Sequence, residues 1–467
     1  MSDSTVSQAV SGVVLRRTAV PGFGQERGLP ILVIIFFFSL MLPILLPVGP
    51  FLLMPHRLFL LIAFFPLVFM LFTGKAGQIL LIDKLMMAGT AWACLALLVN
   101  HGASGIEPLG MHTLEFFGAY LVGRVCIRSA QDFLAFVRFF FVIVLVLAVF
   151  AAAEAITHRP ILLDLIPRSI APAETGMRWG MRRAQTVFVH PILFGAFVST
   201  GFGLFWYVLR VKGGFGTSFF GSFMSGIATV FSLSTGALIS IVMQCIFIGW
   251  DLVSRGIRKR WTIFGGLCAA AYITVDLISN RTPFHVLVTY ASFNTASAYN
   301  RINIWIYGTN NVERNPIFGI GMGDWARPTW MSASVDNFWL LLTMQFGLPM
   351  IICFIPAVLL IVRQVALRDF KTPLERACQA GFLTSLGGAA LAGGTVHYWH
   401  TIMAFMLFFF ASGIWMITAR EDDEGDGDAV RDDPEPSTRY TRTTHRTPPR
   451  KMAQQAGHRR QRRRPVP

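Results

Sequence analysis

Arginine is concentrated in two polar stretches of the chain, and neither stretch contains a lysine. The first, residues 157–183, holds Arg159, Arg168, Arg178, Arg182 and Arg183, and the second, residues 280–337, holds Arg281, Arg301, Arg314 and Arg327. A guanidinium is a planar fork that grips phosphate or carboxylate through two parallel hydrogen bonds, whereas an ammonium acts as a point charge. The choice of arginine therefore indicates phosphate or carboxylate binding. The alternative is that these arginines anchor interfacial helices at lipid headgroups.

The arginine at 183 stands at the head of a run that leads into a hydrophobic segment. Pro191 in this run suits the first turn of a helix, and His190 lies near its cap. A helix that begins there would hold Arg183, with Arg182 beside it, close to the membrane surface. We expect Arg183 to act on a substrate and Arg182 and His190 to help bind it.

The second stretch carries Arg301 four residues before Trp305, so on a helix the two side chains share a face. The alternative for this pair is an interfacial helix with a tryptophan anchor. Asn315-Pro316 and three glycines at 319, 321 and 323 then predict a compact turn with exposed backbone. No strand precedes these glycines, so the pattern does not predict a dinucleotide site. We assign Trp305 and Gly321 to substrate binding.

Asp336 and Asn337 stand immediately before a hydrophobic segment. Either residue could cap a helix. The functional alternative is a carboxylate at Asp336 that faces the loop arginines and accepts a proton from a sugar hydroxyl, with Asn337 beside it in substrate binding.

Metal and cofactor sites are not predicted. His397 and His400 form a His-x-x-His pair without a third ligand nearby in the sequence, and we interpret them as interfacial polar residues. The six cysteines lie in or at the ends of apolar runs, which predicts small buried hydrophobic residues that form neither disulfides nor a metal site.

The elements that must position these residues are membrane spans. Hydrophobic residues make up 54% of the chain and charged residues 14%, and several apolar runs reach the ~17–25 residues that cross a bilayer as a helix. The sequence predicts an all-α integral membrane protein of about twelve spans with a large loop of short helices. The spans begin near Ile31, Leu58, Leu85, Met111, Phe133, Phe188, Phe215, Gly236, Thr262, Asn337, Ala377 and Tyr398. The fourth, Met111 to Ile127, is unusual because it contains Glu115 and Arg124.

Loop charges predict which way the spans run. With the N-terminus inside, Lys and Arg fill the inner loops, while the outer loops 101–110 and 394–397 have neither. We therefore expect a cytoplasmic segment at 1–30 without a cleavage site, a membrane domain at 31–418 with outer loops at about 157–186 and 280–336, and a disordered cytoplasmic tail at 419–467. Because most basic residues flank spans, the net charge of +15 does not indicate nucleic-acid binding. The span centres hold few ionisable groups, which argues against ion-coupled transport.

Together these motifs resemble the O-antigen ligase / Wzy-type polysaccharide polymerase superfamily. The resemblance rests on Arg183 to Gly195, on Phe231-Ser-Leu-Ser-Thr-Gly-Ala237 between two spans, on Arg301-x-x-x-Trp305, on Asn315-Pro-Ile-Phe-Gly-Ile-Gly321 and on Asp336-Asn337, and it covers roughly residues 80–415. It implies a GT-C-like, metal-independent, inverting glycosyltransferase of the bacterial inner membrane whose substrate is a polyprenyl-diphosphate-linked glycan.

The resemblance also implies roles for particular residues. Arg183 and Arg301 match the family's two phosphate-binding arginines. The family's ligases carry a histidine at the position of Asp336, so the carboxylate here fits the exopolysaccharide-polymerase branch better. Membrane lipids are expected partners, with chain-length regulators and export proteins as further candidates.

Three other functions compete with polymerisation. An O-antigen-type ligase would transfer finished glycan to a lipid or protein. A flippase or exporter of lipid-linked sugars would line a central cavity with charge and show repeat symmetry. A non-catalytic scaffold of an export complex would leave the arginine-only loops unexplained.

Overall fold

A computed structural model of the chain describes residues 28–48, 51–165, 176–280, 282, 285, 286, 289 and 295–419. The chain divides into two units, Met1–Arg420 and Glu421–Pro467. The predicted N-terminal segment up to residue 27, the predicted tail from residue 420 and the loop arginines Arg168 and Arg281 lie outside the described residues. Everything below concerns the first unit.

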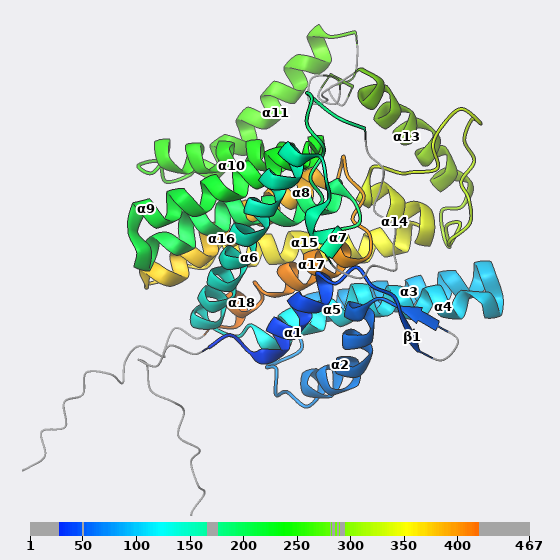
Figure 1. Cartoon of the computed structure of the whole chain (residues 1–467), viewed down its shortest axis with the longest axis horizontal. Helices are drawn as coiled ribbons and strands as arrows, with labels where there is room; N and C mark the ends of the chain where they lie inside the picture. The colour runs from blue at the N-terminus through cyan, green and yellow to red at the C-terminus, as the bar shows by residue number, and fades with distance from the viewer. Residues whose placement is uncertain are drawn as a thin grey trace, which may run out of the picture. The chain divides into compact units, whose positions relative to one another are not determined.

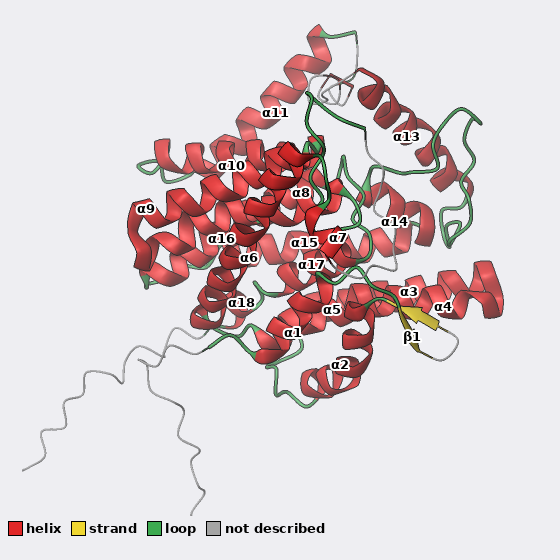
Figure 2. Cartoon of the chain, viewed as in Figure 1, coloured by secondary structure: helices red, strands yellow, loops and turns green. Residues whose placement is uncertain are grey.

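The regular structure among the described residues is almost entirely helical, which confirms the predicted all-α membrane fold (Figure 2). The α-helices are α1 (Ile31–Leu40), α2 (Pro55–Phe72), α3 (Leu81–His101), α4 (Ile106–Thr113), α5 (Ala119–Cys126), α6 (Ala130–Thr157), α7 (Ile161–Leu165), α8 (Pro191–Ser199), α9 (Gly201–Ser232), α10 (Thr235–Val253), α11 (Arg260–Ile278), α13 (Thr295–Arg314), α14 (Phe338–Phe346), α15 (Leu348–Ala366), α16 (Pro373–Ala392), α17 (Thr401–Ala411) and α18 (Trp415–Thr418). A 3-10 turn, η1 (Gly102–Gly105), and a π-helical turn, η2 (Leu114–Gly118), interrupt the α3–α5 region. Strands β1 (Leu46–Val48) and β2 (Phe51–Leu53) pair antiparallel, with Leu46 opposite Leu53.

Eight helical stretches among the described residues are long and apolar enough to cross a membrane. Two of them, Leu81–Cys126 and Pro191–Ser232, are 46 and 42 residues long, about twice what one crossing needs. The second bends at Gly214, whose φ of 72° is left-handed, and the chain returns along itself, with Ser222 Oγ donating to the Phe202 carbonyl at 2.9 Å. The sequence predicts twelve spans instead of eight, because it divides each long stretch into two spans and also counts α1 and α16, which are not among the eight.

Chain connections that the sequence predicts to lie outside gather at one end of the helix bundle, here named the loop end. At this end the Ala184 amide donates to the Phe231 carbonyl at 2.8 Å, and the Phe338 amide donates to the Gly393 carbonyl at 2.8 Å. Figure 1 shows α13 and α14 at the same end, on the right of the view. The bonds join segments from α6 to α17, so residues distant in sequence meet at one surface.

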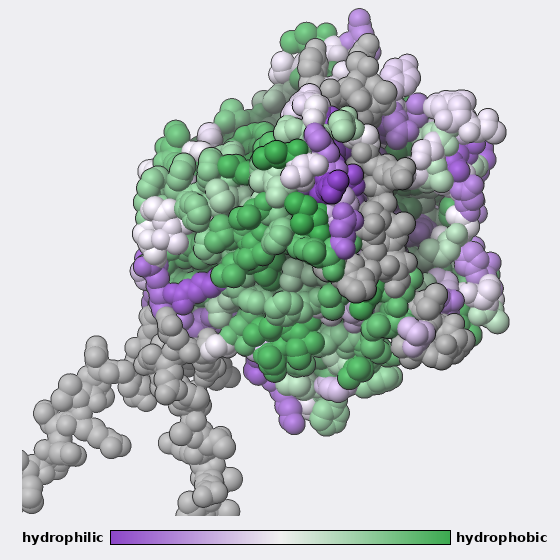
Figure 3. Space-filling model, in the orientation of Figure 1, coloured by the Kyte–Doolittle hydropathy of each residue, from purple (hydrophilic) through white to green (hydrophobic). Residues whose placement is uncertain are grey.

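The interior and the exterior of the bundle are both apolar. Phenylalanine rings pack edge to face in the interior, for example Phe37 against Phe408 with centroids 5.4 Å apart and Phe140 against Phe197 at 5.0 Å. On the visible face, hydrophobic residues form a broad area over the long helices, and hydrophilic residues gather around α13 (Figure 3). Such an exterior suits a protein surrounded by lipid.

A break between α14 and α15 supports the large loop. Gly347 adopts φ 78°, and a Cβ there would lie 2.0 Å from the Ile317 carbonyl oxygen. The Asn315–Gly321 turn docks onto this break, with Ile320 N donating to Met344 O at 2.8 Å and Leu348 N to Pro316 O at 2.7 Å. The glycine-rich motif and the break at Gly347 together attach the large loop to the helix bundle, and this contact is here named the joint.

Candidate active site

The motif at residues 231–237 forms a platform between α9 and α10. Leu233 turns the chain in a left-handed conformation, with φ 45°, and leaves two carbonyls facing the first arginine loop. Arg178 donates from Nη1 to the Leu233 carbonyl at 2.7 Å, and Arg183 donates from Nε to the Ser232 carbonyl at 3.4 Å. Gly236 fits tightly against Val396, since a Cβ there would lie 1.8 Å from the Val396 Cγ2 atom. The platform thus gathers two loop arginines at the loop end.

A hairpin turn presents the first of these arginines. Arg178 and Met181 exchange two backbone hydrogen bonds of 3.0 Å each, and the two residues between them, Trp179 and Gly180, both have positive φ. That geometry is the two-residue turn that reverses a chain most tightly. Arg182, just after the turn, points to α6, with Nε 3.5 Å from Glu154 Oε1.

Helix α13 forms the opposite wall and carries Arg301. It packs closely across α14, because Gly308 leaves room for the Leu340 side chain: a Cβ at Gly308 would lie 2.6 Å from Leu340 Cδ2. Ile304 and Met344 belong to the small apolar cluster that joins the two helices. This packing sets Arg301 beside the residues that lead into α14.

Arg183 and Arg301 each interact with the charges of Asp336 and Arg178. Burial and, to a smaller extent, the charge of Arg178 lower the pKa of Arg183 to about 10, although Asp336 acts to raise it. Burial also lowers the pKa of Arg301. The charge of Asp336 acts to raise this pKa, and the charge of Arg178 acts to lower it. Both guanidiniums stay protonated at neutral pH. Three arginines against one carboxylate leave a net positive, partly buried site that favours an anion.

The sequence leaves open which of Asp336 and Asn337 caps the next helix and which interacts with the loop arginines. Asn337 caps α14, with its side chain accepting from the Leu340 amide at 3.0 Å. Asp336 accepts from the Ser334 hydroxyl at 3.0 Å and interacts with Arg183 and Arg301. The capping task therefore falls on the amide, and the carboxylate is turned towards the arginines.

His190 caps α8, as its position before Pro191 predicts. Its Nδ1 accepts from the Ile192 amide at 3.1 Å. Burial, with Arg183 nearby, lowers the pKa of His190 to about 4. The ring is thus neutral at physiological pH, and because Nδ1 is an acceptor its proton sits on Nε2. His190 packs against Trp399, with centroids 5.5 Å apart, and can offer a hydrogen bond but not a positive charge.

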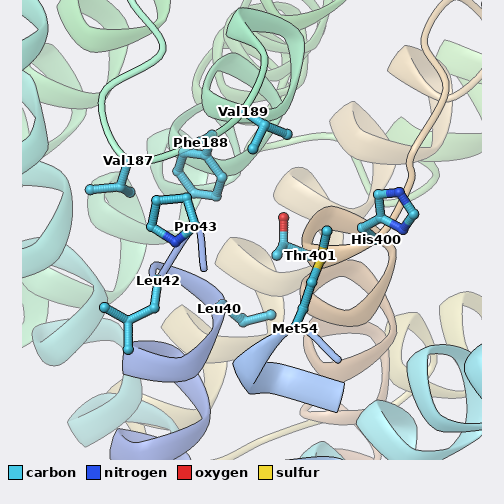
Figure 4. Close-up of a pocket in the computed structure, with 9 residues that line it drawn as sticks. All are labelled: Leu40, Leu42, Pro43, Met54, Val187, Phe188, Val189, His400 and Thr401. Atoms are coloured by element: carbon cyan, nitrogen blue, oxygen red, sulfur yellow. The ribbon is translucent and has the colours of Figure 1, made fainter. Parts of the chain in front are cut away.

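A small apolar hollow borders the segment that links Arg183 to His190. Figure 4 shows its walls, which come from four parts of the chain: the end of α1, the start of α2, the linking segment and the start of α17. The lining residues are Leu40, Leu42, Pro43, Met54, Val187, Phe188, Val189, His400 and Thr401. An apolar hollow therefore borders the segment that follows Arg183 in the chain.

A comparison with protein families bears on this site. Residues 220–355 match the family model described as O-antigen ligase. This part of the chain is thus similar to the O-antigen ligase family. The match confirms the resemblance predicted from the sequence and contains Arg301 and Asp336, whereas Arg178 and Arg183 precede it. No curated protein matches the chain.

Of the two predicted substrate-binding residues in the matched range, Trp305 lies beside Arg301 on α13 and Gly321 lies near the far end of α14. Trp305 is 43% exposed on α13, one turn beyond Arg301. Gly321, with φ 62°, packs where a Cβ would lie 2.2 Å from His101 Nε2, and its amide donates to Gln345 near the far end of α14. That end is about 12 Å from Asn337 along the helix.

One cluster outside the matched domain is not foreseen from the sequence. Arg57 Nε donates to Glu115 Oε1 at 2.7 Å, and Arg57 Nη2 lies 2.8 Å from His400 Nδ1. His56 Nε2 lies 3.1 Å from the same carboxylate oxygen. This cluster explains how a span tolerates Glu115, which sits in the π-helical turn. The partners are separated by 58 or more residues, so no local spacing reveals them.

The remaining acidic and histidine side chains do not form a metal centre in the part of the chain that the structure describes: no group of three or more His, Cys, Asp or Glu could hold an ion there. The charged groups at the candidate active site are instead dominated by arginine. The structure adds Arg178 to the predicted site residues Arg183 and Arg301. Arg178 is included because its side chain donates to the Leu233 carbonyl of the 231–237 platform.

Proposed function

We propose that the protein polymerises polyprenyl-diphosphate-linked oligosaccharide repeat units into an exopolysaccharide at the periplasmic face of the bacterial inner membrane. The observation that carries the proposal is the interaction of Arg183 and Arg301, from loops more than a hundred residues apart, with the single carboxylate of Asp336. The O-antigen ligase family match supports the same class of lipid-linked substrate.

The arginines would act on the leaving group. In the transfer, a hydroxyl oxygen of the acceptor glycan attacks the anomeric carbon of the donor, and the bond from that carbon to the diphosphate oxygen breaks. Polyprenyl diphosphate departs with the bonding electrons, so negative charge grows on the diphosphate. Fixed guanidiniums at Arg178, Arg183 and Arg301 stabilise this charge without reorganisation, which lowers the barrier.

Asp336 would receive the proton of the attacking hydroxyl. Its side chain interacts with Arg183 and Arg301 and so would lie beside the diphosphate, and general-base help of this kind contributes roughly 10²–10⁴-fold. His190 is unsuited to this task, because its pKa of about 4 and its occupied Nδ1 make it a hydrogen-bond donor. Attack from the face opposite the diphosphate inverts the anomeric centre.

The substrate's lipid would follow the apolar surface beside the site. The hollow lined by Leu42, Val189 and their neighbours adjoins the segment that carries Arg183. A diphosphate held by the arginines therefore has hydrophobic surface within reach for the first part of the polyprenyl chain. This arrangement suits a substrate that carries charge and hydrocarbon on one molecule.

The second candidate is an O-antigen-type ligase, and the description of the matched family favours it. The same arginines would hold the same diphosphate, and only the acceptor would differ. Asp336, where the ligases have histidine, favours the polymerase. The two functions separate by which intermediate accumulates in a deletion strain: single lipid-linked repeat units for a polymerase, and lipid-linked polymer for a ligase.

The decisive experiment is reconstitution. Purified protein is given the host's polyprenyl-diphosphate-linked repeat unit in EDTA, and the products are separated by length. A ladder of longer lipid-linked glycans that disappears in Arg301→Ala, but persists in Arg314→Ala at the exposed end of α13, supports the polymerase. Transfer only after a lipid or protein acceptor is added would assign ligase activity. Loss of the ladder in EDTA alone would contradict metal independence.

A further inference from the structure

One buried carboxylate near the site takes no part in the proposed reaction. Glu154 lies in the last turn of α6 and is 1% exposed. Its Oε2 accepts from the Thr186 amide at 2.9 Å and from the Gln185 amide at 3.2 Å, and its Oε1 lies 3.5 Å from Arg182 Nε. A single carboxylate thus contacts three residues of the segment that contains Arg183.

This segment contains a backbone conformation that its sequence disfavours. Thr186 has φ 52°, in the left-handed region that β-branched residues avoid. Its buried hydroxyl makes no hydrogen bond, so the side chain does not compensate for the conformation. Such a residue persists only where the surroundings hold it. The Phe188 amide donates to the Gln185 carbonyl at 2.8 Å within this turn, and the hydrogen bonds from the Gln185 and Thr186 amides to Glu154 tie the turn to α6.

The position of Arg183 depends on the same backbone. The hydrogen bond from its own side chain to the Ser232 carbonyl is long, at 3.4 Å, and therefore weak. The segment around it is not helical, and its neighbour Ala184 is tied to Phe231 by one backbone bond of 2.8 Å. Fixing the chain on both sides of Arg183 requires the second anchor at Glu154.

We propose that Glu154 is a positioning residue: its carboxylate holds the left-handed turn at Gln185 and Thr186, and this turn presents Arg183 to the diphosphate. The inference rests on the proposed function of Arg183. A displacement of the guanidinium by about 1 Å is enough to lower turnover strongly. Glu154 touches neither substrate nor reacting atoms.

The experiment compares rescue by two substitutions at Thr186. Glu154→Gln keeps the shape but weakens the anchor, and kcat for ladder formation is expected to fall roughly 10–100-fold, with KM changed less. Adding Thr186→Gly, which accepts φ 52° without strain, is expected to restore kcat to within roughly threefold of wild type. Adding Thr186→Val, which also removes the hydroxyl but keeps the β-branch, restores nothing. Glu313→Gln, an exposed carboxylate on α13, retains full activity.

Hydrogen exchange of the peptide spanning 183–190 gives a readout that does not depend on activity. Exchange is expected to be faster in Glu154→Gln and to return towards the wild-type rate with Thr186→Gly. Unchanged exchange in Glu154→Gln, or equal rescue by glycine and valine, overturns the inference. If Glu154→Gln does not fold, Glu154→Asp, which withdraws the carboxylate by one methylene, serves in the same comparison. Full activity of Arg183→Ala would overturn the proposed function instead, and the exchange test of Glu154 would still stand.

Discussion

At the scale of single residues, the site depends on how charge is distributed around one carboxylate. Arg183 and Arg301 are both partly desolvated, which makes their contacts with an anion stronger than at an open surface. Arg178 repels both guanidiniums, and Asp336 attracts both. A diphosphate would supply the further negative charge that the three arginines lack.

Arg178 provides a test of this balance, because its role depends on the structure and not on a family motif. Arg178→Ala removes both a positive charge and the bond to the Leu233 carbonyl. Turnover is expected to fall about 10–100-fold, somewhat less than for loss of a main contact to developing charge. Ladder formation at saturating substrate measures the effect. Arg159→Ala, an exposed arginine of the same loop, is the matched control, and equal behaviour of the two variants would contradict the assignment.

His190 gives a prediction about pH. Its folded pKa of about 4 lies below the ordinary value of 6.5, so the unfolded chain binds more protons between these two values. Acidification through that window therefore lowers the stability of the folded protein. The Tm in detergent should fall less steeply from pH 7 to pH 5 in His190→Asn, which keeps a capping side chain, than in wild type. His397, also with a pKa of about 4, preserves part of the dependence.

A control at an exposed histidine sharpens the comparison. His158→Asn replaces a solvent-facing ring at the end of α6, and the Tm of that variant should follow the wild-type curve. An identical slope for His190→Asn and wild type would mean that the ring at 190 is not held neutral by its surroundings.

At the scale of elements, the functional loop is held by a joint in the bundle. Gly347 separates α14 from α15, and the Asn315–Gly321 turn closes over it. The indole of Trp92 on α3 also donates to the Phe346 carbonyl at 2.9 Å, next to this joint. Since α13 packs on α14, a change at the joint moves the wall that carries Arg301.

Substitution of the glycine tests the joint. Gly347→Ala adds a methyl group where the backbone has φ 78° and where a Cβ would meet the Ile317 carbonyl. The free energy of unfolding is expected to fall by about 2 kcal/mol or more, because strain and overlap add. Thermal denaturation in detergent measures it. Gly266→Ala in α11, where nothing lies within 4 Å of the added atom, should be neutral or slightly stabilising. Equal Tm values would contradict a tight joint.

The sequence predicts the elements better than it predicts their contacts. Long apolar runs predict the spans, and the order of residues predicts one cap near His190 and another at Asp336 or Asn337, because both signals are local. The pairing of Glu115 with Arg57, and of Arg178 with the Leu233 carbonyl, arises only when distant segments fold together. Neither hydrophobic periodicity nor a short motif indicates such long-range bonds. From the sequence alone, the charged residues of the span Met111 to Ile127 therefore look energetically unfavourable in a membrane.

At the scale of the whole molecule, the proposed active-site residues lie at one end of the helix bundle. The arginine loops, the platform between α9 and α10 and the capped start of α14 all meet at the loop end. Ion pairs at the other end serve a different purpose: Arg124 donates to the carbonyls of Ala76 and Gln78 and lies 3.1 Å from Asp83, which closes the connections between helices. A bundle with its polar site at one face suits a reaction at a membrane surface.

The predicted sidedness is testable by labelling. In a cysteine-free background, Ser332→Cys in the loop before α14 and Lys371→Cys before α16 are both exposed positions. The sequence predicts one crossing between them, formed by α14 and α15 (residues 338–366), so we expect the two cysteines to lie on opposite sides of the membrane. The reagent is a membrane-impermeant maleimide applied to spheroplasts, in which the inner membrane is intact. It should label position 332 in spheroplasts and position 371 only after lysis. Ser104→Cys, at the loop end after α3, should behave as position 332 does, because an even number of crossings separates them. Labelling of position 371 but not 332 before lysis would show that the predicted topology is inverted. The arginine site would then face the cytoplasm, which would contradict a periplasmic polymerase.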